Sequence, residues 1–91
     1  MGMADTIDLD CGIAYGRIAG WLDDELALPS ENNAWTYACH GGSCRIAIEP
    51  LEKRSFGLIS LERTHLLVQG DETALASFYK LFTLRFLSAG G

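Results

Sequence analysis

The sequence predicts an α+β fold in which an antiparallel sheet of about five strands, with two hairpins, packs against a C-terminal amphipathic helix. Three observations carry this prediction. Apolar residues occupy alternate positions near the N-terminus, two later segments alternate on both sides of turn residues, and the last segment has a helical period. The chain has 91 residues, 48% of them apolar, which suits one domain over residues 6–91 after a disordered tail at 1–5.

The first element is a strand predicted over residues 6–15, because apolar side chains occupy every second position there. A bend at Gly16 would carry this strand toward Trp21. The alternative for residues 10–26 is a helix, since a helical apolar stripe is also present and Asp10 would cap it. Three glycines in the segment favour the strand, because each costs about 1 kcal/mol in a helix interior.

A hairpin is predicted over residues 35–48, after an acidic loop or single helical turn at 23–33. Its turn is expected at 40–43, with Cys39 opposite Cys44. This register places every large apolar side chain of the hairpin on one face, and a slip of one residue would destroy that arrangement. The apolar side chains concerned are Trp35, Tyr37, Ile46 and Ile48, whereas Thr36, Arg45 and Glu49 fall on the other face.

A second hairpin is predicted after Pro50, which is expected to end the preceding strand because proline cannot donate to a central ladder. Its turn is placed in a loop at 62–65. The apolar side chains expected to face one another across that turn are Ile59 and Leu61 on one strand, and Leu66 and Val68 on the other.

The last element is a helix that begins after Gly70, with Asp71 as its N-cap. One helical stripe predicts the core residues Leu75, Phe78, Phe82 and Phe86. Three further leucines lie off this stripe. Leu81, Leu84 and Leu87 are therefore the predicted contact surface of a homodimer or of a complex with another protein.

Composition limits the classes of function. The net charge of −5 disfavours nucleic-acid binding, which depends on clustered Lys and Arg. Neither a signal peptide nor an apolar stretch of membrane-spanning length is visible, and three cysteines do not make a secreted disulfide framework. A cytoplasmic protein without a membrane partner is expected.

The segment from Cys39 to Cys44 is the first candidate for chemistry, because two thiols and the His40 imidazole are ligand types that zinc prefers. His65 or Cys11 would complete such a site. A cross-strand disulfide is a second alternative if the two cysteines are directly opposed. The favoured interpretation is that both cysteines are small core residues, since free cysteine is among the most buried residue types.

The chain ends in Gly90 and Gly91, and this pair resembles the tail of ubiquitin-like sulfur carriers. The resemblance implies a C-terminal carboxylate that an adenylating enzyme activates for conversion to a thiocarboxylate. It covers two residues, and a predicted helix precedes the pair where those carriers have a strand. No catalytic constellation and no cofactor site is predicted, so the leading hypothesis is a non-enzymatic interaction domain that self-associates.

Overall fold

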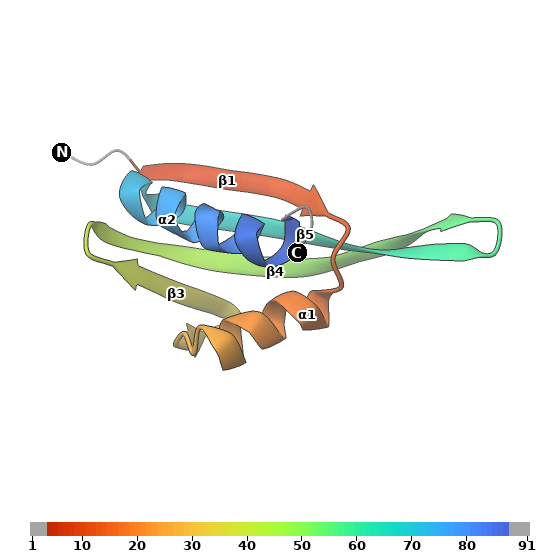
Figure 1. The fold of residues 1–91 in the computed structure, drawn as a ribbon, viewed down its shortest axis with the longest axis horizontal. Coiled ribbons are helices and arrows are strands. Elements are labelled where there is room, and N and C mark those ends of the chain that lie inside the picture. The colour runs from red at the N-terminus through yellow and green to blue at the C-terminus, as the bar shows by residue number, and fades with distance from the viewer. Residues whose placement is uncertain (1–3, 88–91) are drawn as a thin grey trace.

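The structure is a computed structural model that describes residues 4–87 and contains a five-stranded antiparallel sheet with helices on one face (Figure 1). The predicted α+β fold is confirmed. The strands are β1 (Ala4–Cys11), β2 (Ser30–Glu31), β3 (Ala34–Cys39), β4 (Gly42–Phe56) and β5 (Ile59–Asp71), in the sheet order β1-β5-β4-β3-β2. The helical segments are α1 (Tyr15–Gly20), α2 (Glu72–Phe82), and the π-helical turns η1 (Trp21–Glu25) and η2 (Thr83–Leu87) that continue them.

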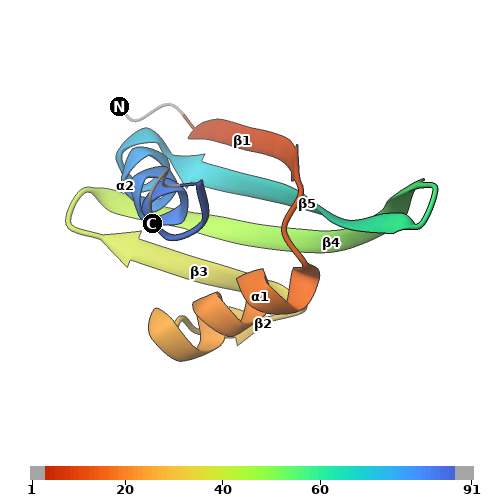
Figure 2. The ribbon, with the colours of Figure 1, turned by 45° about the vertical axis from the view of Figure 1, so that its right-hand side comes forward.

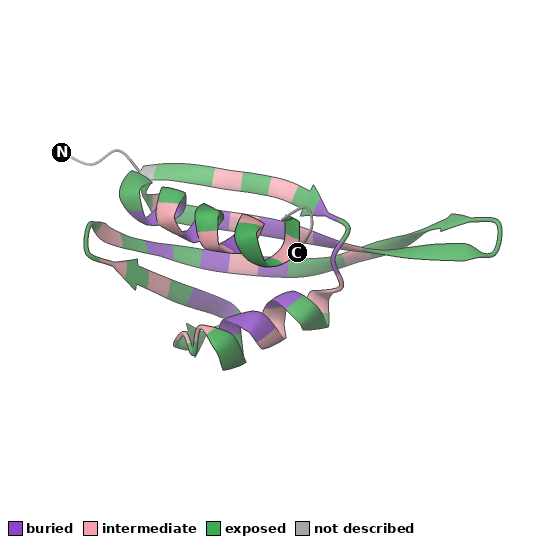
Figure 3. Ribbon diagram, in the orientation of Figure 1, coloured by how far each residue is buried: buried purple, intermediate pink, exposed green. Residues whose placement is uncertain are grey.

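Both helices cover the same face of the sheet, and the core lies between the two layers (Figure 2). Alternate side chains of the strands point into this layer, so buried residues alternate with more exposed ones along the inner parts of β4 and β5, whereas the outer ends of both strands are exposed throughout (Figure 3). Trp21 joins η1 to α2 and η2 through a tilted contact with Phe78 and an edge contact with Phe86, at centroid distances of 5.7 and 5.3 Å. The largest fully buried apolar side chains are Phe78, Phe82, Ile18, Leu22, Ile46, Leu66 and Val68.

Residues 10–26 are mostly helical, so the predicted strand over 6–15 is wrong beyond Cys11. The chain leaves β1 there and forms α1 and η1, and Ala14 rather than Asp10 is the N-cap residue of α1. The apolar stripe of this segment is buried against the sheet. Burial of that stripe outweighs the low helix propensity of the glycines, because most helical stability in proteins comes from tertiary packing.

The acidic segment at 23–33 contains a short strand that the sequence pattern does not predict. β2 pairs with β3, and the connection between them is the dipeptide Asn32–Asn33. Both asparagines have a positive φ, 52° and 62°, which is the conformation of a two-residue hairpin turn. Asparagine tolerates this conformation better than other non-glycine residues.

The next hairpin has the predicted faces but a register displaced by two residues. Cys39 pairs with Gly42 and Tyr37 pairs with Cys44, so the turn comprises residues 40–41 only. A displacement of two residues returns every side chain to its own face of the sheet. The apolar side of the hairpin therefore still faces the core, whereas the predicted Cys39–Cys44 pairing is wrong.

β4 does not end at Pro50, and the predicted turn at 62–65 is also wrong. Pro50 pairs with Thr64, and the chain reverses only at residues 57–58. Proline is tolerated here because β3 pairs with β4 no further than Ala47, so no strand on that side needs an N–H from Pro50. The four apolar residues that were predicted to face one another all lie in β5.

The C-terminal helix begins where predicted, although Asp71 is an N-cap without a side-chain capping bond. Its carboxylate instead accepts a hydrogen bond from the Ser43 backbone N–H at 2.9 Å, which links the start of α2 to β4. The core prediction is confirmed for Leu75, Phe78 and Phe82, which are buried. Phe86 is partly buried and packs against that core.

Candidate functional site

The predicted thiol site is not assembled by the fold. Cys39 and Cys44 are diagonal rather than opposite neighbours, and diagonal pairs lie about 7–8 Å apart, beyond the reach of a disulfide. Cys44 is buried, and burial together with nearby Cys39 and Asp71 raises its pKa to about 11. The thiol is therefore protonated near neutral pH, whereas a metal ligand or a nucleophile is a thiolate.

The remaining proposed metal ligands lie elsewhere. Cys11 pairs with Thr64 and His65 pairs with Glu49, which places them five or six residues along the strands from Cys44, or about 16–20 Å. Between residues 4 and 87, no group of three or more His, Cys, Asp or Glu side chains is arranged to hold a metal ion. His40 is exposed in its two-residue turn.

His65 belongs instead to the helix-free face of the sheet. Its Nε2 lies 2.6 Å from Oδ1 of Asp8 on β1. This hydrogen bond raises the pKa of His65 above its usual 6.5, and the charges of Asp8, Asp10 and Glu49 act in the same direction. The pair therefore favours an imidazolium on an exposed surface, which is an electrostatic link between β1 and β5.

The three acidic residues at 23–25 have different surroundings. Asp23 accepts a hydrogen bond from the Trp35 indole N–H at 2.8 Å, and Glu25 pairs with Arg85 at 3.2 Å. Asp24 is exposed. Two of the three carboxylates therefore tie η1 to β3 and η2.

The predicted contact leucines differ in their environment. Leu84 and Leu87 in η2 are 60% and 53% exposed. Leu81 is partly buried and packs against the core. Leu84 and Leu87 are thus exposed, whereas the predicted tail residues Gly90 and Gly91 lie outside the described residues.

The largest exposed apolar feature is one that the sequence pattern does not predict. Residues 52–62, called the arm below, form the outer end of the β4–β5 hairpin and extend from the body of the molecule (Figure 1). All eleven residues of the arm are exposed. β1 and β3 have both ended before this point, so the arm is a two-stranded ribbon with no third strand beside it.

The arm has one apolar and one polar face. Arg54 pairs with Leu61 and Phe56 pairs with Ile59, and paired side chains point to the same side of a ribbon. The other side carries the pair formed by the two serines at 55 and 60, together with a 3.2 Å ion pair between Lys53 and Glu62. The exposed fractions on the apolar face are 55% for Phe56, 62% for Ile59 and 48% for Leu61, and Leu58 in the turn is fully exposed.

A register irregularity at the base of the arm creates this arrangement. Leu51 pairs with Arg63 and Arg54 pairs with Leu61, so β4 has one more residue than β5 between the two pairs. A bulge of one residue reverses the faces that the following residues of β4 occupy. Without it, Phe56 would lie on the opposite face from Ile59.

At the other end of the molecule, an apolar groove of about 360 Å³ lies between β1 and α2. Ile7, Leu75 and Ala76 line it together with the half-exposed ring of Tyr79. Asp5 and Glu72 complete the lining. Among residues 4–87, neither carboxylate has a cation partner.

Searches of protein-family models, curated proteins and solved structures found no match to this chain. Within residues 4–87, no helix has the length and apolar character needed to cross a membrane. Function is therefore inferred from the surface features of the molecule.

Proposed function

We propose that this chain is a non-enzymatic interaction domain that self-associates and uses the arm as its contact surface. The apolar face of the arm supports this proposal. Phe56, Leu58, Ile59 and Leu61 are each about half exposed or more, and none of them packs against the core cluster. Monomers seldom keep such patches exposed, and those that persist are commonly interfaces.

The isolated position of the arm is a second argument. A two-stranded hairpin is marginally stable in water unless a third strand or a helix packs on it. The arm has neither among the described elements, yet its sequence places large apolar residues on one face. A partner that covers this face would supply the packing that the body of the domain does not.

The cytoplasm is the compartment that we propose for this domain. All three cysteines are free, and Cys11 and Cys44 are buried as ordinary core residues. Free thiols of this kind stay reduced in the cytoplasm, where they need no disulfide partner.

The experiment is sedimentation velocity on the wild-type chain over a wide range of concentration, compared with the double variant Phe56→Ser/Leu58→Ser. The wild type is expected to form dimers, and the double variant is expected to remain monomeric with an unchanged far-ultraviolet spectrum, because neither residue contacts the core. Leu84→Glu is the comparison outside the arm, since Leu84 is an apolar residue about as exposed as Phe56.

Two results would overturn the proposal. A wild-type chain that stays monomeric at all concentrations would show that the domain does not self-associate. If Leu84→Glu dissociates the dimer and the arm variant does not, the contact surface lies on η2. That result would agree with the sequence-based prediction for Leu81, Leu84 and Leu87.

A further inference from the structure

The groove between β1 and α2 matches the arm in chemistry. It offers the apolar side chains Ile7, Leu75 and Tyr79, and the arm offers an apolar face of similar character. Large apolar side chains that leave water by entering such a groove stabilise a complex in proportion to the buried area. The groove and the arm belong to the same chain but do not contact each other in it.

The charges at the two surfaces are complementary. Arg54 lies on the apolar face of the arm and forms no ion pair or hydrogen bond with any side chain between residues 4 and 87. Asp5 and Glu72 lie at the groove and have no cation partner there. A charged residue at the edge of an apolar contact orients the partner and disfavours wrong pairings, so the three residues suit a single interface.

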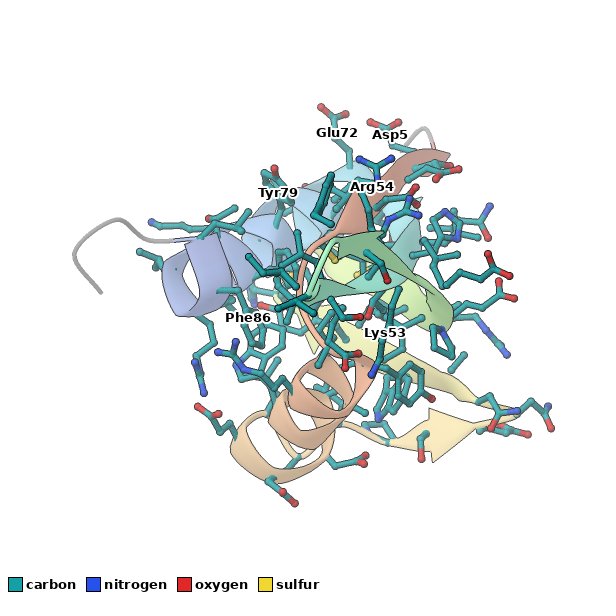
Figure 4. All side chains as sticks on the ribbon, turned by 90° about the vertical axis from the view of Figure 1, so that its right-hand side faces the viewer. Asp5, Lys53, Arg54, Glu72, Tyr79 and Phe86 are labelled. Carbon is teal, nitrogen blue, oxygen red and sulfur yellow. The ribbon has the colours of Figure 1, made fainter. Side chains whose placement is uncertain are left out.

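The placement of the two surfaces is compatible with two-fold symmetry. The molecule measures 50 × 32 × 25 Å, and the arm and the groove lie toward opposite ends of the long axis (Figure 1). Seen along that axis, Arg54 lies on the same side of the molecule as Asp5, Glu72 and Tyr79, and Lys53 lies on the other side (Figure 4). A rotation of 180° about an axis perpendicular to the long axis therefore brings each arm to the partner's groove at once.

The area is also adequate. The four apolar side chains of the arm expose on the order of 400–500 Å², if a large side chain presents about 150–200 Å² when free. Two arms then contribute on the order of 900 Å², and the surfaces that they cover, of which each groove is only a part, would contribute a similar area, which reaches the roughly 1,200–2,000 Å² of stable interfaces.

We infer that the partner of the arm is a second copy of this chain, and that each arm is seated in the β1–α2 groove of the other copy, with Arg54 facing Asp5 and Glu72. This inference rests on the proposed function and assigns the surface that receives the arm. The dimer is isologous, so each chain donates one arm and accepts one arm.

The test uses charge reversal on the two surfaces separately. The arm variant is Arg54→Glu, and the groove variant is Asp5→Arg/Glu72→Arg. Each is expected to raise the dissociation constant of its own homodimer on the order of tenfold or more, because both symmetric contacts then place like charges together. A mixture of the two variants is expected to restore dimerisation, since in the mixed dimer both contacts again join opposite charges.

Controls separate this effect from net charge and from folding. Arg45→Glu changes the net charge as the arm variant does, and Asp24→Arg/Glu31→Arg changes it as the groove variant does, and all three residues are exposed away from both surfaces. Neither control is expected to alter the dissociation constant by more than about twofold. The groove variant also removes the favourable negative charge of Glu72 at the start of α2. Thermal unfolding of each variant measures such losses of stability separately from dimerisation.

The outcomes separate failure of the arm-in-groove arrangement from failure of self-association through the arm. If the apolar arm variant is monomeric but the mixture of charge-reversed variants does not dimerise, the arm is a contact surface and its assignment to the groove is wrong. If the wild-type chain is a monomer, the proposed function fails first. Recovery of dimers only in the mixture supports the arm-in-groove arrangement.

Discussion

Replacing Asp23 with alanine is expected to destabilise the domain, because this exposed carboxylate accepts the indole N–H of a buried tryptophan. The Nε1 of Trp35 lies 2.8 Å from Oδ1 of Asp23, and the Trp35 residue is only 6% exposed. Asp23 lies on η1 and Trp35 on β3, so the bond joins the first helical segment to the sheet. Removal of the carboxylate leaves the indole N–H of a buried residue without this hydrogen-bond partner.

The magnitude follows from the character of the bond. A hydrogen bond to a charged acceptor contributes about 1.5–3 kcal/mol, and access of water to the vacated site reduces the loss to about 1–2 kcal/mol. For a domain of this size, each kcal/mol lowers the melting temperature by about 4–8 °C. The expected fall for Asp23→Ala is therefore about 4–16 °C.

The assay is thermal unfolding followed by circular dichroism, at equal protein concentration for each variant. Asp24→Ala is the matched control, since Asp24 is also exposed in the first turn of η1 and bonds to no described side chain. Its loss of negative charge is the same, so the difference between the variants isolates the bond to Trp35. Equal melting temperatures for the two variants would refute the reasoning.

Three further predictions address pH, thiol chemistry and backbone packing. Because the bond to Asp8 raises the folded-state pKa of His65 above 6.5, its stabilisation is complete below pH 6.5 and is lost as the pH rises through the raised value. Urea unfolding across this range is expected to show the loss in the wild type and a flatter profile in Asp8→Asn, and identical profiles would contradict it. Iodoacetamide at pH 8 is expected to modify Cys39 well before Cys44, whose buried thiol has a pKa of about 11; peptide mass spectrometry checks the order, and earlier modification of Cys44 would show that its site is open. Gly70→Ala is expected to cost more than about 2 kcal/mol in urea unfolding, because φ is +154° and a Cβ would lie 2.5 Å from a backbone oxygen of β4. A wild-type free energy in that variant would mean that the two strands separate at little cost.

Short-range periodicity predicted much of this molecule correctly. The stripe of Leu75, Phe78 and Phe82 is a local property, since residues three and four apart lie on one face of any helix. The faces of the hairpin with Trp35 and Ile46 were equally predictable, because side chains alternate whatever the register, and a displacement by two residues preserves each face. The fold class follows from these patterns, and so does the aromatic core.

Features that depend on distant parts of the chain were not predictable in the same way. Whether residues 10–26 extend β1 or form a helix depends on the apolar face of the sheet, which β4 and β5 supply from residues far along the chain. Pro50 reads as a strand end, yet it is tolerated because β3 stops three residues short of it. The residues around Pro50 do not show how far β3 extends along β4.

The candidate site shows the same limit. Phe56, Ile59 and Leu61 are apolar residues in a strand-forming segment, and the simplest interpretation buries such residues. A bulge at the base of the arm and the early ends of β1 and β3 instead leave all of them on an exposed face. Within one helix or one regular stretch of strand, the pattern of residues decided which side chains share a face. Only the tertiary structure decided which face meets the core and which is left for a partner, because burial depends on how far the neighbouring strands extend.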